Sequence, residues 1–293
     1  MMGGMTPPLS RRSFLLGTGG VAGAAFVGAT GLVGCANPAT QLTLPTPDAV
    51  GSVRERLETM MTTAASNTDL LGLSVRDLRT GATYGYRGDF DTQSASIAKV
   101  MIVLLALRKA RAEGTELTFE QYGLASRAII NSDNDSADAL WEWVGGRPAY
   151  TALASELGLP NTHADDRSEF WSWTNTTPDD QRSLMDALVD GTRVIDVDDR
   201  LYLLDLMSKT NSEQTWGIGH DRGTHVHVQM KNGWVQFRSL DNLWAVNSIG
   251  HVVGEGRDYT AAIMTRMSTF DEGRTLVDAI GASLFQILDA NLI

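Results

Sequence analysis

A serine and a lysine three positions apart stand at the head of an apolar segment of the chain. Ser96 and Lys99 form this pair, and Lys99 is one of only four lysines in 293 residues. Positions three apart lie on one face of a helix, so we expect the hydroxyl and the ammonium group to lie close together. A serine attacks as a nucleophile when a base takes its proton, and a lysine in a partly desolvated cleft has a pKa low enough to do this. The pair therefore indicates nucleophilic catalysis.

A second motif, Ser132-Asp133-Asn134, falls in the loop between two predicted helices. Ser132 is suited to pass a proton to a leaving nitrogen, and Asn134 to donate a hydrogen bond to a substrate carbonyl. Taken alone, this tripeptide has the composition of an ordinary loop and does not indicate a function.

A third motif, Lys231-Asn232-Gly233, lies near the end of a predicted strand. Lys231 would bring positive charge to the loop serine and to a substrate carboxylate, and Gly233 would allow another backbone to approach closely. The two-residue period of a strand places Asn232 and Trp234 on one face and Lys231 on the other. The main-chain amides of Ser96 and Trp234 are suited to form an oxyanion hole.

In this order the three motifs resemble the signature of the penicillin-recognising serine enzymes, the class A β-lactamases and penicillin-binding proteins. That signature is S-x-x-K, S-D-N and K-T-G, and only the third motif differs here, as K-N-G. The resemblance runs from about residue 46 to the end of the chain. It implies a β-lactamase/transpeptidase-like fold, an acyl-enzyme intermediate, and no metal or organic cofactor.

The resemblance also implies a role for each residue. Ser96 is the nucleophile, and Lys99 is its general base or part of the proton relay. Ser132 passes a proton to the leaving nitrogen, and Asn134 positions the substrate amide. Lys231 supports the loop serine and the substrate carboxylate.

Departures from the family pattern affect substrate binding and deacylation. Asn232 replaces a Thr or Ser, although an amide can also donate to a carboxylate, and the large Trp234 would narrow the cleft or stack on substrate. Class A β-lactamases deacylate with a glutamate in an E-x-x-L-N stretch, which the region 165–177 lacks. Asp165, Asp166 and Glu169 are alternatives among which the spacing does not choose.

The hydrophobic pattern predicts an α/β (α+β) fold with helices at both ends. Apolar residues at helical spacing predict helices over 47–65, 99–112, 124–130, 137–144, 149–157, 178–190, 201–208 and 276–288. Alternating segments predict strands over 71–77, 82–86, 226–235, 243–250 and 259–267. The simplest arrangement is one five-stranded antiparallel sheet built from both ends of the chain, covered by the first and last helices, with an all-helical subdomain beside it.

The N-terminus has the pattern of an exported lipoprotein. Arg11 and Arg12 precede an uncharged stretch, as in twin-arginine signals, and the stretch ends in a lipobox-like sequence at Cys35, the only cysteine. We expect a signal peptide over 1–34, a lipidated cysteine and tether over 35–46, and a serine hydrolase domain over 47–293. The α/β part of this domain would comprise 47–90 and about 209–293, and the helical part about 91–208. Lipid on Cys35 would hold the protein at the outer face of the cytoplasmic membrane.

The charge and the remaining polar residues limit the partners. A net charge of −11 disfavours nucleic acid, and we expect a monomer that acts on a small molecule or a peptidoglycan peptide. His225 and His227 are two apart on a strand, which allows a metal pair but fits exposed imidazoles better. Arg238 and Arg257 are candidates for binding a substrate carboxylate.

Three functions remain open from the sequence. The first is hydrolysis of β-lactam or related amide bonds. The second is a D-alanyl-D-alanine peptidase-like penicillin-binding enzyme with slow deacylation. The third is a catalytically weak, lipid-anchored module that binds peptidoglycan or acts as a sensor.

Overall fold

The computed structural model of the chain describes residue 44 and residues 51–220, 222–237 and 241–289. The predicted signal peptide, Cys35 and Arg238 lie outside these residues. The helices are α1 (Val53–Ala65), α2 (Ala98–Ala112), α3 (Phe119–Ile130), α4 (Asn134–Val144), α5 (Gly146–Glu156), α6 (Pro178–Asp190), α7 (Val197–Ser208) and α8 (Phe270–Ile287). The strands are β1 (Leu71–Asp77), β2 (Thr83–Tyr86), β3 (Thr92–Gln93), β4 (Asn175–Thr176), β5 (His227–Phe237), β6 (Leu243–Gly254) and β7 (Arg257–Met267). In the described part of the chain, no helix has the length and apolar character to cross a bilayer.

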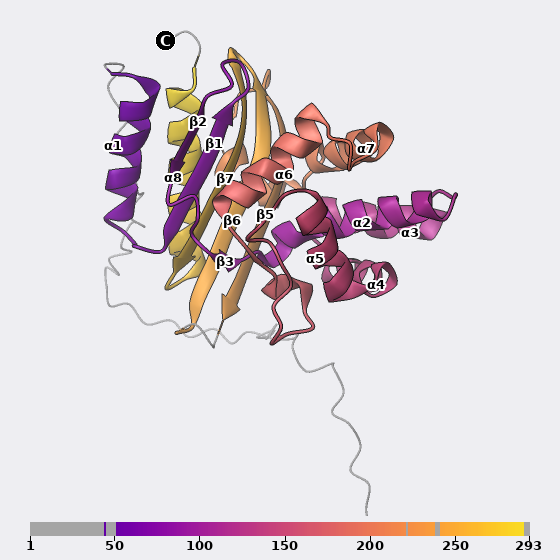
Figure 1. Cartoon of the computed structure of the whole chain (residues 1–293). Coiled ribbons are helices and arrows are strands. Elements are labelled where there is room, and N and C mark those ends of the chain that lie inside the picture. Colours follow the sequence, from indigo (N-terminus) through magenta and orange to yellow (C-terminus); the bar gives the residue numbers. More distant parts are fainter. Residues whose placement is uncertain (1–43, 45–50, 221, 238–240, 290–293) are drawn as a thin grey trace, which may run out of the picture. The chain divides into compact units, whose positions relative to one another are not determined.

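The main sheet is assembled from both ends of the chain, as the sequence predicts (Figure 1). Its five strands are antiparallel and follow the order β2-β1-β7-β6-β5. The early strand β1 pairs with the late strand β7, with Leu71 opposite Thr265 and Asp77 opposite Tyr259. This order leaves β5, which carries the third motif, at the edge of the sheet.

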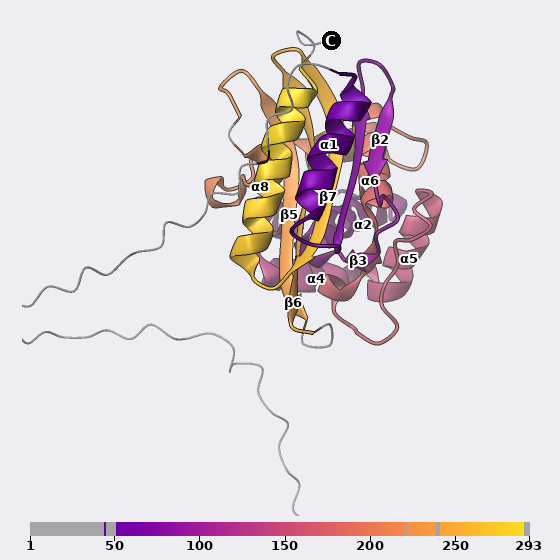
Figure 2. The same cartoon turned by 90° about the vertical axis from the view of Figure 1, so that its left-hand side faces the viewer.

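The first and last helices pack side by side on one face of the sheet (Figure 2). Leu276, Val277, Ile280 and Leu284 recur at helical spacing on α8 and are buried against the sheet. They share an apolar cluster with Leu57 of α1 and with residues of β1 and β7. Each such buried side chain stabilises the fold by about 1.5–3 kcal/mol, so this layer holds the two chain ends together.

The helix that follows the serine motif runs through the interior of the helical region. Ten of its fifteen residues are buried, including Val100, Ile102, Val103 and Leu104. The sequence predicts this position because the segment is apolar on nearly every side. A helix buried along most of its length is a rigid support for residues at its N-terminal end.

Several helix starts differ from the prediction, three of them at capping boxes: α8 begins at Phe270, directly after Thr269, and not at residue 276. α1 begins at Val53, where Ser52 and Glu55 form a capping box, and not at residue 47. α3 begins at Phe119, where Thr118 and Gln121 form another, and not at residue 124. A reciprocal capping box satisfies amides that would otherwise have no partner, and this outweighs the apolar pattern on which the prediction relied.

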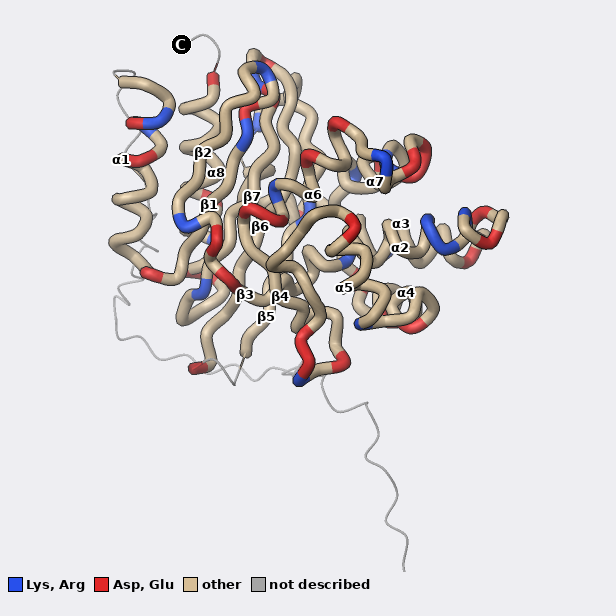
Figure 3. The backbone as a smooth tube through the Cα atoms, viewed as in Figure 1, with Lys and Arg blue, Asp and Glu red and all other residues tan. Residues whose placement is uncertain are grey.

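Acidic and basic residues are both spread over the described backbone (Figure 3). Several basic side chains are paired, such as Arg111 with Asp199 at 2.7 Å and Arg76 with Asp190 at 2.6 Å. Part of the positive charge of the described residues is therefore held in local ion pairs.

Candidate active site

The serine of the first motif lies in a tight turn directly before α2. A short 3-10 helix, Ala95–Ile97, carries Ser96, so the serine precedes the α-helix on which the sequence analysis placed it. Ala95 has a positive φ of 51°, a strained conformation for a residue with a side chain. Ser96 is half-buried and lines a pocket of about 370 Å³.

The lysine of the first motif is fully buried in the first turn of α2. Its Nζ donates to the carbonyl of Ser132 at 2.5 Å and to Oδ1 of Asn134 at 2.8 Å, with Oγ of Ser132 at 3.3 Å. Burial lowers the pKa of Lys99 to about 7, although the charges of Asp133 and Asp138 oppose this shift. The neutral form of this amine is therefore populated near pH 7, and a neutral amine can accept a proton.

The loop serine lies between the two lysines. Nζ of Lys231, also fully buried, donates to Oγ of Ser132 at 2.9 Å and to the carbonyl of Asn232 at 2.9 Å. Burial, together with the charge of Lys99, holds the pKa of Lys231 well below its usual value. Ser132 itself has a positive φ of 57°. The structure therefore brings all three motifs together around one hydroxyl.

No hydrogen bond joins the hydroxyl of Ser96 to Lys99 among the described contacts of this lysine. Ser96 lines the same pocket as Ser132 and Asn134, the two residues to which Lys99 donates. Catalytic hydrogen bonds in sites without substrate are often long and shorten when substrate binds. The arrangement is compatible with direct proton transfer and with a relay through the loop serine.

Gly233 lets the edge strand β5 touch the serine turn. A Cβ at this position would lie 2.7 Å from the amide nitrogen of Ser96 and 2.8 Å from that of Ile97. Both neighbours are backbone atoms of a strained turn, so neither side can shift cheaply. The glycine is thus required for the spacing between the third motif and the first.

The side chain of Asn232 is turned away from this arrangement, contrary to its predicted contact with substrate. Asn232 is fully buried, and its Nδ2 donates to the carbonyls of Gln214 at 2.8 Å and Trp216 at 3.0 Å. The alternation of β5 puts Asn232 on the face opposite Lys231, where these two carbonyls are within reach. Its donor group therefore holds the 214–216 segment.

The ring of Trp234 follows the same face of the strand. It packs against Trp216, with ring centroids 5.9 Å apart, and against Phe270 at 5.4 Å. The residue is part of the pocket wall, but the ring belongs to the aromatic cluster beside α8. Stacking of this ring on substrate therefore stays a prediction.

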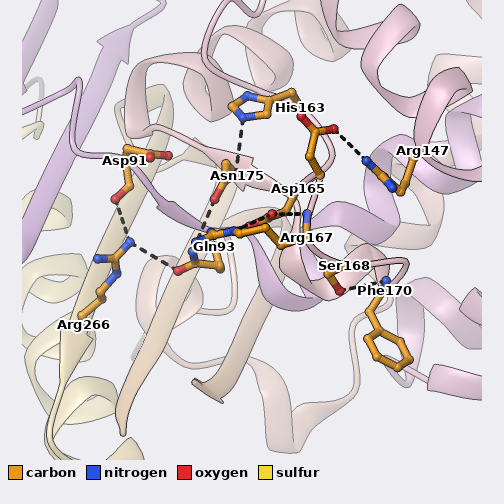
Figure 4. A network of polar contacts seen from close by, with 11 residues as sticks. Asp91, Gln93, Arg147, His163, Asp165, Arg167, Ser168, Phe170, Asn175 and Arg266 are labelled. Atoms are coloured by element: carbon orange, nitrogen blue, oxygen red, sulfur yellow. Dashed lines mark hydrogen bonds and ion pairs between the residues drawn. The ribbon is translucent and has the colours of Figure 1, made fainter. Parts of the chain in front are cut away.

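None of the three acidic residues considered for deacylation lines the pocket. Asp165 is paired with Arg167 at 2.6 Å, which lowers the pKa of this carboxyl to about 2. Arg147 binds Asp166 at 2.7 Å and Glu169 at 2.9 Å, and these two acidic side chains are 99% and 85% exposed. Figure 4 shows Arg167 beside Asp165 in this loop.

The ends of the loop 163–175 are joined by backbone hydrogen bonds. The amide of His163 donates to the carbonyl of Asn175 at 3.1 Å, and the reverse bond measures 2.8 Å. Gln93 donates to Oδ1 of Asn175 at 3.3 Å and accepts from Arg266 of β7 at 3.3 Å (Figure 4). These bonds connect the loop to the sheet and fix its ends.

Two pocket residues were missed by the sequence analysis as functional candidates. Trp171, in the short 3-10 helix Trp171–Trp173, places its ring centroid 4.6 Å from Nζ of Lys99. Its Nε1 donates to Oδ1 of Asp138 at 2.7 Å. Asp138 lies four residues after Asn134 on α4, so the spacing of the second motif could have indicated it.

The remaining candidates lie away from the pocket. Arg257 donates to the carbonyl of Phe285 at 2.6 Å and pairs with Asp289 at 2.7 Å, so it is engaged at the end of α8 and does not bind a carboxylate in the cleft. His227 begins β5 with its side chain exposed. Within the described ranges, no three His, Cys, Asp or Glu residues are grouped as metal ligands.

Known structures share this fold. A class A β-lactamase from Bacteroides cellulosilyticus superposes with a TM-score of 0.70 at 17% identity, covering 82% of this chain and 99% of that one. A structure of PBP-A superposes with a TM-score of 0.67 at 21% identity, covering 78% and 94%. The helices, the five-stranded antiparallel sheet and the pocket thus define a protein with the class A β-lactamase fold.

The sequence identifies the family directly. A model of the Beta-lactamase enzyme family matches residues 52–123 and 113–288, and this chain belongs to that family. Proteins named as lipoprotein LppW in Mycobacterium tuberculosis and Mycobacterium bovis are 27% identical over 221 residues, which cover 73% of this chain and 68% of theirs.

Proposed function

We propose that this chain is a serine enzyme that forms an acyl-enzyme on Ser96 by opening a β-lactam or a related amide bond. The observation that carries the proposal is the position of the Ser132 hydroxyl, 2.9 Å from Lys231 Nζ and 3.3 Å from Lys99 Nζ. Two fully buried amines with lowered pKa values beside a serine in a pocket are suited to accept and return protons.

Acylation follows from this arrangement. Oγ of Ser96 attacks the carbonyl carbon of the substrate amide and gives its proton to neutral Lys99, directly or through Ser132. The bond between that carbon and the amide nitrogen then breaks. The nitrogen leaves with a proton from Ser132, which Lys99 or Lys231 replaces.

Main-chain amides supply the stabilisation of the oxyanion. β5 is an edge strand, so part of its main-chain hydrogen-bonding capacity has no neighbouring strand. The close approach at Gly233 brings this edge to the amide of Ser96. The amides of Ser96 and Trp234 are suited to bind the carbonyl oxygen as its charge develops.

A second candidate is a penicillin-binding enzyme with slow deacylation. Asp165, Asp166 and Glu169 are all paired with arginines outside the pocket, which favours it. Both candidates share the acylation step and differ in how fast water releases the acyl group.

The proposed location is the cell envelope, with the chain anchored by lipid on Cys35. The lipobox-like sequence before this cysteine supports it, as does the lipoprotein name given to the mycobacterial relatives. The twin-arginine pair, Arg11 and Arg12, points to export in the folded state.

A chromogenic cephalosporin separates the two candidates. The full chain and its Ser96→Ala variant are mixed with this substrate, and ring opening is followed with time. Continuous turnover that Ser96→Ala lacks supports the hydrolase. One equivalent of product followed by arrest supports slow deacylation, and equal rates in both proteins would contradict a role for Ser96.

A further inference from the structure

A tryptophan of the loop covers the buried lysine of the pocket. The ring centroid of Trp171 lies 4.6 Å from Nζ of Lys99, and only 6% of Trp171 is exposed. The hydrogen-bond partners of the same ammonium group are Ser132 and Asn134. Since Lys99 is fully buried, the ring and these polar groups together exclude solvent from the nitrogen.

The position of this ring is fixed at two points. Its Nε1 donates to Oδ1 of Asp138 on α4 at 2.7 Å. The carbonyl of Trp171 accepts from the amide of Thr174 at 3.1 Å and from its hydroxyl at 2.9 Å. Both the indole and the main chain are therefore held, and the ring is positioned by the fold.

The acidic groups near Lys99 are already engaged. Asp133 accepts from the amide of Ser136 at 2.8 Å and caps α4. Asp138 is the one carboxylate among the described residues that line the pocket, and one of its oxygens binds the indole. A water that hydrolyses an acyl-enzyme must give a proton to a base, and the neutral amine of Lys99, whose nitrogen lies 4.6 Å from the centroid of the Trp171 ring, is such a base.

We propose that Trp171, held by Asp138, prolongs the life of the acyl-enzyme by keeping the hydrolytic water away from Lys99. The inference rests on the proposed acylation of Ser96. In hydrolysis the water oxygen bonds to the acyl carbon and the bond from that carbon to Oγ of Ser96 breaks. One water proton goes to the base, and a proton returns to the serine oxygen. Trp171 acts through Lys99 and the water, so it is a positioning residue.

The test measures acylation and deacylation separately. The full chain is labelled with a fluorescent penicillin to obtain the acylation rate. After excess penicillin is removed, intact mass follows the decay of the adduct. The wild-type adduct should persist, while in Trp171→Leu it should decay at least about tenfold faster. The acylation rate of this variant is measured separately, because exposing Lys99 to solvent also raises its pKa.

Three further variants test whether a faster decay comes from losing the contact between the Trp171 ring and Lys99. Trp173→Leu removes a ring of the same 3-10 helix that packs on Phe237 at 5.0 Å, and it should leave the decay unchanged. Asp138→Asn keeps an oxygen for the indole N–H, so its adduct should outlast that of Asp138→Ala, which should release the ring and accelerate decay. Both variants remove the charge that raises the pKa of Lys99, so the comparison between them isolates the contact with the ring. If Asp138 were the deacylation base, both of its variants would slow decay.

The outcomes distinguish this inference from the proposed function. An adduct of equal lifetime in wild type and Trp171→Leu overturns the inference alone, as does a wild-type adduct that decays rapidly. If Trp171→Leu does not fold, Asp138→Ala decides: faster decay supports the inference and unchanged decay overturns it. Absence of any wild-type adduct overturns the proposed function and the inference with it.

Discussion

Two buried lysines beside one serine hydroxyl explain how this pocket can move protons near neutral pH. Lys99 and Lys231 are fully buried, and each loses hydration that would stabilise its charge. The positive charge of Lys99 further lowers the pKa of Lys231. Since the two amines share the hydroxyl of Ser132, the neutral form of one is favoured by the charge of the other.

The pH dependence of acylation tests this account of Lys99. Its pKa is about 7, so the neutral, proton-accepting form increases as the pH rises through 7. We expect the acylation rate to rise about tenfold per pH unit below pH 7 and to level off above it, as measured with a fluorescent penicillin. A rate that is flat between pH 5 and 8, or that falls over this range, would rule out Lys99 as the base.

Asn232 is expected to stabilise the fold more than it aids acylation. Asn232→Ala leaves the buried carbonyl of Trp216 and the partly buried carbonyl of Gln214 without their donor. The loss costs about 1–3 kcal/mol for the buried group and less for the other. For a chain of this size, each kcal/mol lowers Tm by about 2–4 °C, which calorimetry can measure. The acylation rate of the variant at 20 °C should remain close to wild type.

The matched control is Gln236→Ala on the same strand. Gln236 donates to the carbonyl of Asn242 at an exposed position, so its loss should hardly change Tm. The opposite result for Asn232→Ala, an unchanged Tm with strongly reduced acylation, would mean that the amide binds substrate after all.

At the scale of elements, the site depends on how closely β5 approaches the turn before α2. Gly233→Ala would place a Cβ 2.7 Å from the amide of Ser96 and push the strand away. A displacement of about 1 Å can reduce catalysis about 100-fold, and we expect a loss of acylation of this order. Gly85→Ala on the edge strand β2 is the control, because its Cβ would lie 3.4 Å from the carbonyl of Leu73. Equal acylation by both variants would contradict the account.

The sequence predicts elements well where one physical signal dominates. The bounds of β1 and α6 agree with the prediction, because alternation defines the first and Thr177 followed by Pro178 defines the start of the second. α1 and α3 begin elsewhere because capping boxes set their starts. The sheet assembled from both ends is confirmed as well.

The orientation of individual side chains in the site was less predictable. The three motifs identify Ser96, Lys99, Ser132 and Lys231 as candidates. In the fold these four residues lie at or beside one pocket. The contact between Trp171 and Lys99 depends on a loop without periodicity, and on α4, from which Asp138 reaches the indole. The spacing from Asn134 could have indicated Asp138, but the contact between Trp171 and Lys99 leaves no pattern in a single sequence.

At the scale of the whole molecule, the proposed lipid anchor on Cys35 would attach the protein to the membrane. Cys35→Ser should abolish incorporation of a palmitate analogue and release the protein from the membrane fraction, because no other thiol is present. Ser96→Ala should keep its lipid label, which separates anchoring from catalysis. Lipid labelling that persists in Cys35→Ser would contradict the assignment.

The central claim is that Ser96 becomes acylated, and intact-mass analysis after exposure to penicillin tests it most directly. The account predicts a mass increase equal to one penicillin molecule, mapped by peptide analysis to Ser96 and absent from Ser96→Ala. An unmodified mass at saturating penicillin, or an adduct that remains in Ser96→Ala, would contradict it.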